Sequence, residues 1–160
     1  MKFVSRHPDR LVLRLDSREY DALRAALALR AHLSRRRRPI SGDASTPRDV
    51  PADADAELHE ALGEHRRHLG EAVEALLADP KRCAPLPRGA RELTLGTEDA
   101  TLLLQTLNDL RVGAWEHLGC PDFEEEDRPE VTEENFLCLW ALQVTDLFLA
   151  FLLRGLQTED

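Results

Sequence analysis

The sequence is poor in the residues that build disulfide frameworks or paired redox sites. Its three cysteines, Cys83, Cys120 and Cys138, lie far apart, and no C-x-x-C pair occurs. They do not form the even set that a small disulfide-bonded secreted domain requires. The first ten residues, MKFVSRHPDR, lack the apolar run of a signal peptide. We therefore expect a reduced, cytoplasmic protein.

Motifs of catalysis and metal binding are also missing. There is no glycine-rich phosphate loop, no H-E-x-x-H, and no Ser-His-Asp or Cys-His arrangement in a recognisable motif. The segment HEALGEHRRH contains His59, Glu60, Glu64, His65 and His68. We interpret the shared face of Glu64 and His68 as a solvated acidic stripe, and His65 as a core histidine, rather than as metal ligands. We predict no metal and no cofactor, and the sequence favours a protein that is not an enzyme.

Lysine is nearly absent, because all 21 basic residues except Lys2 and Lys81 are arginine. The formal net charge of −9 is unevenly distributed along the chain. Residues 1–50 carry 12 basic and 6 acidic side chains, whereas residues 51–160 carry 9 basic and 24 acidic ones. An acidic body repels nucleic acid and anionic lipid, so only the first third of the chain could attract them.

One basic cluster follows the first predicted helix and consists of Arg35, Arg36, Arg37 and Arg38. These arginines are a candidate contact for the phosphates of a polyanion. No aromatic residues interleave with them and no recognition helix is evident, so we rank nucleic-acid binding below protein binding. The same cluster could instead meet the acidic body of a neighbouring subunit or of another protein.

The patterning of apolar residues predicts a single domain over residues 1–160. Alternating leucines predict a β-hairpin within the first fifteen residues, and Asp16 with Glu19 has the spacing of a capping box. The helix that follows is expected to end near Leu33. Prolines, glycine and small polar residues then predict a flexible loop over residues 34–54.

Three more helices are expected after that loop. They cover residues 55–78, 97–119 with Thr97 as N-cap and Gly119 as exit, and a final segment capped by Thr132. Leu93 and Leu95 suggest one further short strand. The predicted fold class is mostly α, a four-helix bundle-like domain with a short N-terminal β-hairpin. In it, the third and fourth helices form an antiparallel core pair.

The most apolar stretch is NFLCLWALQVTDLFLAFLLRGL, residues 135–156, which could cross a membrane, fill a core or hold a partner. Its apolar length is at the lower limit for a membrane span. A polar edge runs along one side of the helix; it is formed by Asn135, Gln143, Asp146, Ala150, Arg154 and Gln157. A lone lipid-facing span has no use for such an edge. We therefore predict no membrane span but the central helix of the bundle, covered on most sides, which a dimer interface could share.

A pair of charges stands out within the two most apolar helices. Arg111 projects from the middle of the apolar arc of the third helix, and a buried arginine needs a partner. Asp146 is the obvious partner, and Asn108 lies near the edge of the same arc. These three residues form a candidate buried ion pair or small-ligand site. We favour the structural ion pair, because such pairs also place titratable groups in apolar surroundings.

Around LLQTLNDLRVGAWEHLG the chain resembles the bacterial, mainly actinobacterial, family numbered 2017 among the domains of unknown function. The positions that carry this resemblance are Leu107, Asn108, Asp109, Leu110, Arg111, Leu118 and Gly119. An apolar final helix with a glutamine in mid-course, LWALQVTDLFLAFLLRGL, is similar too. The resemblance implies no established enzyme activity. It also implies a link to transcriptional regulation, in part through paired cysteines. This chain lacks a close cysteine pair, so a thiol switch does not carry over.

These observations favour a non-enzymatic, cytoplasmic regulatory or protein-interaction domain that acts through a protein partner or as a homo-oligomer. One alternative is a small-molecule-binding or enzymatic helical domain with its site around Arg111 and Asp146. A pocket that contains Arg111 and is open to solvent would favour that alternative. The other is a regulator that contacts the DNA backbone through Arg35–Arg38.

Overall fold

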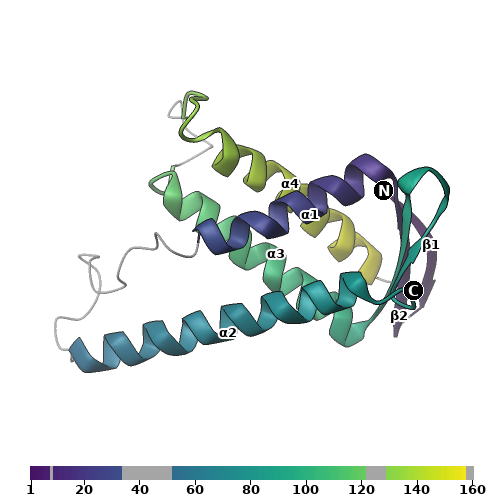
Figure 1. Cartoon of the computed structure of the whole chain (residues 1–160), viewed down its shortest axis with the longest axis horizontal. Coiled ribbons are helices and arrows are strands. Elements are labelled where there is room, and N and C mark those ends of the chain that lie inside the picture. Colours follow the sequence, from purple (N-terminus) through teal and green to yellow (C-terminus); the bar gives the residue numbers. More distant parts are fainter. Residues whose placement is uncertain (8, 34–51, 122–128, 158–160) are drawn as a thin grey trace.

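A computed structural model describes residues 1–7, 9–33, 52–121 and 129–157 of the chain (Figure 1). Within these residues it contains four α-helices: α1 (Ser17–Leu33), α2 (Ala52–Ala78), α3 (Thr97–His117) and α4 (Phe136–Leu156). Four strands accompany them: β1 (Lys2–His7), β2 (Arg10–Leu15), β3 (Cys83–Pro85) and β4 (Arg91–Gly96). A short 3-10 turn, η3 (Pro87–Gly89), joins β3 to β4.

The four strands form one antiparallel sheet in the order β1-β2-β4-β3. The fold is therefore mixed α and β, and the expectation of a mostly α bundle with a hairpin was too simple. The predicted hairpin is β1 and β2, and the predicted strand at Leu93 and Leu95 is β4. The sequence reading missed β3, because it has three residues, too few to show an alternating pattern. Its hydrogen bonds come from the neighbouring strand β4.

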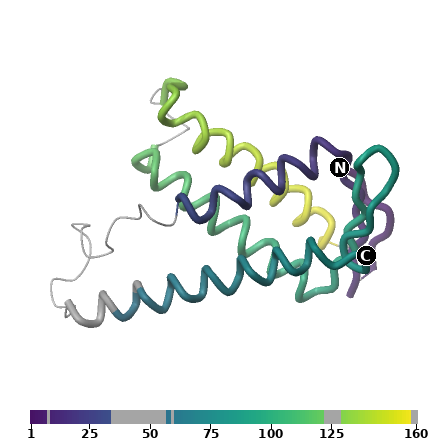
Figure 2. Tube along the Cα trace, in the orientation of Figure 1, coloured from purple at the N-terminus to yellow at the C-terminus, as the bar shows by residue number. Residues whose placement is uncertain are grey.

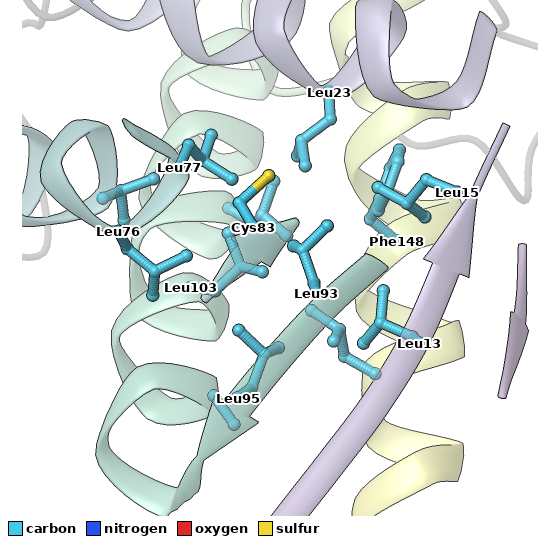
Figure 3. Close-up of a cluster of buried hydrophobic side chains, with 14 of the residues drawn as sticks. Leu13, Leu15, Leu23, Leu76, Leu77, Cys83, Leu93, Leu95, Leu103 and Phe148 are labelled. Atoms are coloured by element: carbon cyan, nitrogen blue, oxygen red, sulfur yellow. The ribbon is translucent and has the colours of Figure 1, made fainter. Parts of the chain in front are cut away.

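One face of the sheet supplies the main core. Leu11 and Leu13 of β2 pair in register with Leu95 and Leu93 of β4, so their side chains project to the same face. Helices cover that face, and Figure 3 shows how leucines from sheet and helices meet there. The residues labelled in that view are Leu13, Leu15, Leu23, Leu76, Leu77, Cys83, Leu93, Leu95, Leu103 and Phe148. The sheet thus closes one end of the helical layer.

A second, smaller core lies between α1, α3 and α4. It contains Ala26 and Leu33 from α1, Leu110 and Ala114 from α3, and a buried stripe of α4. As Figure 2 shows, α3 leads away from the sheet and α4 returns to it, so the two helices form an antiparallel pair.

The long helix α2 is covered only near its C-terminal end. Val73, Leu76 and Leu77 are buried, whereas Leu58 near its N-terminal end is 47% exposed. The N-terminal half extends past the other helices (Figure 1). Of the flexible loop predicted over residues 34–54, residues 34–51 lie outside the described residues. Helix α2 begins at Ala52 rather than at residue 55.

The capping residues predicted at the starts of α1 and α3 are confirmed in part. The predicted capping box forms: the Asp16 and Glu19 backbone N–H groups each donate to the other residue's carboxylate, at 2.8 and 2.9 Å. The N-cap of α3 is Gly96 rather than Thr97, and the Asp99 carboxylate accepts its N–H at 3.3 Å. The Asp99 carboxylate also accepts a hydrogen bond from the Arg82 guanidinium at 2.8 Å.

Arg82 joins the end of α2 to the start of α3. Its guanidinium contacts Asp79 at 3.1 Å as well as Asp99. The hydrogen bond from the Lys81 N–H and the bond from Arg82 together lower the pKa of Asp79 below the usual value of an aspartate. The three groups hold the start of α3 in place beside α2.

The C-terminal end of α4 packs closely against the sheet at Gly155. A Cβ placed there would lie 2.5 Å from Phe3 and 3.0 Å from Leu11. Phe3 is itself held by Phe151, whose ring stacks on it with centroids 4.1 Å apart. By contrast, a Cβ at Gly63 on α2 would meet nothing within 4 Å.

We predict that the same change has opposite consequences at the two glycines. Gly63→Ala should raise the free energy of unfolding by up to about 1 kcal/mol, because alanine is the better helix former. Gly155→Ala gains the same propensity but must displace Phe3 and Leu11, which costs about 1–3 kcal/mol. Urea unfolding of both variants checks this. Equal stability of the two would contradict the close packing of α4 on the sheet.

Candidate functional site

Helix α4 is buried along only one face. Its buried residues are Cys138, Ala141, Leu142, Thr145, Phe148, Leu152 and Gly155. At 100° per residue these fall on one side of the helix. On other sides Phe136, Leu147 and Leu153 are 53%, 59% and 49% exposed. The expectation that α4 would be a central helix covered on most sides is therefore wrong.

The arrangement of the helices explains this one-sided cover. Both α1 and α3 lie against the same side of α4, and β1 meets its C-terminal end. The remaining helix, α2, packs on α3 and on the sheet rather than on α4. Among the described residues no further element remains to cover the opposite side. The polar edge predicted from the sequence lies on this open side, since Gln143, Asp146 and Arg154 are all exposed.

By length and composition alone, α4 is the one described helix that could cross a membrane. One third of its most apolar window is buried inside the protein. The test is weak for a single helix, since core helices of soluble proteins also pass it. The exposed face combines leucines with Asp146 and Arg154, which sets it apart from a uniformly apolar lipid-facing surface.

Arg111 and Asp146 face each other across the open side of α3 and α4. An Arg111 guanidinium nitrogen lies 3.5 Å from a carboxylate oxygen of Asp146. Their side chains are 45% and 60% exposed, so the expected burial of this pair is wrong. The reason is that Arg111 stands at the edge of the buried face of α3, on the side that neither α1 nor α2 covers. Asn108, one turn earlier on α3, is exposed as well.

An exposed ion pair contributes little to stability, because water solvates both charges in the unfolded and folded states. We predict that Arg111→Ala changes the free energy of unfolding by less than about 1 kcal/mol, whereas removal of a buried partner costs about 3–5 kcal/mol. The neighbouring Leu110 is buried, so Leu110→Ala should cost about 2–5 kcal/mol and serves as the control. Thermal unfolding distinguishes them, and a loss at Arg111 as large as at Leu110 would contradict the exposed placement.

A groove runs along the open side, between α3 and α4. One end is a pocket of about 740 Å³, and the other is a pocket of about 630 Å³. Arg111 and Asp146 line both pockets, so the pair crosses the middle of one continuous α3–α4 groove. The apolar residues along its walls are Leu104, Val112, Trp115, Val131, Phe136, Leu139, Trp140, Leu142, Leu149 and Leu153.

The turn after α3 shapes the larger end of the groove. Gly119 leaves the helix with φ of +87°, as predicted from the sequence, and Cys120 follows with φ of +59°. This turn brings the Pro121 carbonyl to the indole of Trp115, whose Nε1 donates to it at 3.1 Å. Trp115 is thereby held at the rim of the groove, 39% exposed, rather than in the core.

The cysteines offer no paired redox site among the described residues. None of Cys83, Cys120 and Cys138, which the structure all describes, forms a disulfide. Cys83 lies in the main core, and burial raises the pKa of its thiol, which disfavours the reactive thiolate at neutral pH. Cys138 is buried and Cys120 is exposed.

The other candidate residues are placed apart from the groove. Arg35, Arg36, Arg37 and Arg38 lie outside the described residues, as does the side chain of His59. Glu60, Glu64, His65 and His68 are exposed on α2, so the expectation of a core histidine at His65 is wrong. The cause is that these four side chains lie on a side of α2 that no other described element covers. In the part of the chain that the structure describes, no group of three or more His, Cys, Asp or Glu residues could hold a metal.

The residues of the family resemblance divide between core and surface. Leu107 and Leu110 are buried, Arg111 lies in the groove, and Asp109 pairs with Arg66 of α2 at 3.0 Å. The motif therefore combines core packing with contacts to α2 and to the groove. No protein-family model, curated protein or solved structure matches the chain. Membership of the family stays a prediction from those residues.

The sequence pointed to the polar residues at the centre of the groove but not to the apolar residues of its walls. It singled out Arg111, Asp146 and Asn108, and all three line the groove. It did not single out Trp115, Phe136 or Trp140. A signal was present for Phe136, because on a helical wheel it lies next to the polar edge of α4. The position of Phe136 beside the polar edge indicates an exposed side chain, whereas its apolar character alone would indicate a buried one.

Proposed function

We propose that this protein is a non-enzymatic interaction domain that binds a helix of a protein partner in its α3–α4 groove. The observation that carries this proposal is the open apolar side of α4. Phe136, Leu147 and Leu153 are about half exposed there, next to a groove with mostly apolar walls. Exposed apolar side chains gathered on one side of a protein are typical of protein-binding sites.

The shape of the groove suits a helix. Two antiparallel helices form its long walls, and an amphipathic helix can insert its apolar face between them. The Arg111–Asp146 pair at the centre supplies one donor and one acceptor that remain accessible to solvent. Polar groups at the middle of an apolar interface fix the register and orientation of a partner more than they add affinity.

The charges in the groove favour protein over nucleic acid. The charged residues that line the two pockets are Arg111 and Asp146, which cancel each other. A surface for DNA or RNA instead needs an excess of positive charge to neutralise phosphates. Binding of DNA through Arg35–Arg38 would therefore use a different part of the chain.

The wider role that we propose is regulatory and cytoplasmic. It is supported by the absence of catalytic motifs from the sequence and by the resemblance to a family linked to transcriptional regulation. A helix-binding groove is compatible with that role, because regulators commonly act by docking on a second protein. The groove itself does not select a pathway.

A pull-down from native lysate tests the proposal. We expect the tagged wild-type protein to retain a partner that the Phe136→Asp variant loses, because a carboxylate in an apolar groove carries a desolvation cost on binding. Leu58→Asp is the matched control, since Leu58 is similarly exposed but lies on α2, away from the groove. Retention of the same proteins by all three baits would reject the groove as the binding site.

The alternative function, binding of a small molecule, is favoured by one observation. The larger pocket contains Arg111, and its 740 Å³ falls in the usual range for ligand sites, about 300–1,000 Å³. An apolar molecule with a carboxylate would place its tail beside Trp115 and Trp140 and its charge on Arg111. We rank this below helix binding because the groove continues past the ion pair instead of closing around a ligand.

Titration with decanoate, a simple apolar carboxylate, separates the two functions. If the pocket takes such ligands, tryptophan fluorescence should change in a saturable manner, and Arg111→Gln should weaken binding by about tenfold through loss of a charge-assisted contact. Leu58→Asp again serves as the control. A linear, unsaturable response that Arg111→Gln leaves unchanged would reject the small-molecule function.

A further inference from the structure

We propose that the partner on the open side of α4 is a second copy of this chain, with the two α4 helices packed antiparallel about a two-fold axis at Ala150. This inference rests on the proposed function, because it identifies the protein partner that covers the open side of α4. It is carried by the order of charged, small and apolar residues along the exposed face of α4.

Three residues at intervals of four form an exposed ridge on α4: Asp146, Ala150 and Arg154. Ridges of this i, i+4 type run parallel to each other when two helices cross at about −50°, the commonest packing class in globular proteins. The ridge carries a negative charge at one end, a small side chain in the middle and a positive charge at the other. When a copy of the ridge is reversed about Ala150, Asp146 of each chain lies beside Arg154 of the other.

The flanking apolar residues obey the same symmetry. Leu147 precedes Ala150 by three residues and Leu153 follows it by three, and both are about half exposed. The two-fold axis places Leu147 of one copy at the same level as Leu153 of the other. The small side chain of Ala150 allows the helix axes to approach to the short end of the usual 8–10 Å range. Both leucines would then lose their exposure to water, which is the main favourable term in association.

The local charge does not oppose this contact, although the protein as a whole carries a net charge of −9. On this face the ridge contributes one acidic and one basic residue, and Arg111 adds a second basic residue beside Asp146. Asp146, with two oxygens, can accept a bond from Arg111 of its own chain and another from Arg154 of the second copy. The pairing thus replaces water around an accessible carboxylate with a second guanidinium.

An unrelated helix would fit this face only if it presented the reverse order of charge, small residue and charge, flanked by apolar residues. The chain's own α4 presents that order by symmetry. An isologous interface needs one patch that complements itself under a two-fold rotation, and the Asp146–Ala150–Arg154 ridge has this property. A second copy is therefore the partner that the observed residues specify.

Charge reversal at the two ends of the ridge tests the proposal by sedimentation velocity of the full chain. We expect the wild type to form dimers at about 100 µM or below. Asp146→Arg and Arg154→Asp should each weaken self-association by at least about tenfold, because each places like charges opposite each other at two symmetric positions. Glu71→Arg, an equally drastic change on the exposed surface of α2, should leave the dissociation constant unchanged.

Mixing the two weakened variants provides the sharper measurement. In the heterodimer, arginine at position 146 meets aspartate at position 154, and Arg154 of the first chain meets Asp146 of the second. Dimers should therefore return to near the wild-type dissociation constant in the mixture. Unchanged thermal midpoints of the separate variants would show that each still folds. A mixture as weakly associated as its components would overturn the proposed pairing.

A cross-link locates the axis. Ala150→Cys in a Cys120→Ser background should form an intermolecular disulfide under mild oxidation, because a residue on the two-fold axis meets its own copy. Glu71→Cys in the same background should form little intermolecular disulfide under those conditions, although it still dimerises. Equal cross-linking at both positions would overturn the placement of the axis at Ala150.

Failure of this inference and failure of the proposed function give different results. The wild type could be monomeric and capture a different protein that the Phe136→Asp variant does not retain. That result would overturn the second copy as partner and leave the groove as a binding site. A monomer whose captured proteins are insensitive to Phe136→Asp would overturn both. Sedimentation with phosphatidylcholine vesicles in place of dimer formation would also overturn both, because the open side of α4 would then be a lipid-binding surface.

Discussion

The one-sided burial of α4 is the constraint on which the rest of this structure depends. A helix this rich in leucine and phenylalanine gains most by burying its whole circumference, yet the described parts of the chain cover one stripe of it. The close approach at Gly155 holds its C-terminal end on the sheet, and α1 and α3 hold its middle. The uncovered leucines, the groove and the exposed ion pair are consequences of that geometry.

The Arg111–Asp146 pair has a different meaning on an open surface than it would have in a core. Buried, the two charges would need each other to offset the loss of hydration, and the pair would be a structural element. Exposed, each charge keeps its water and remains available to another molecule. On an open surface the two residues are therefore candidates for recognition of another molecule rather than for stabilisation of the fold. The apolar side chains on either side of them strengthen that interpretation.

Local physical signals allowed much of the fold to be predicted. Alternating leucines located β2 and β4, reciprocal carboxylate and N–H spacing located the start of α1, and Gly119 marked the exit from α3. Strand β3 and the uncovered half of α2 were not predictable in this way. A three-residue strand has no period of its own and exists because β4 offers it hydrogen bonds. Likewise, an amphipathic pattern shows which side of a helix can be buried but not whether another element reaches it.

The candidate site was likewise predictable from the sequence only in part. Periodicity and residue chemistry are local properties, and they predicted the helices that carry Arg111 and Asp146, the polar edge of α4 and the absence of recognised catalytic motifs. The exposure of the two charges, the position of Trp115 and Phe136 along a groove and the open side of α4 are visible in the folded structure alone. Those outcomes depend on where α1 and α2 pack, and contacts between residues distant in sequence leave no periodic signal in a single chain.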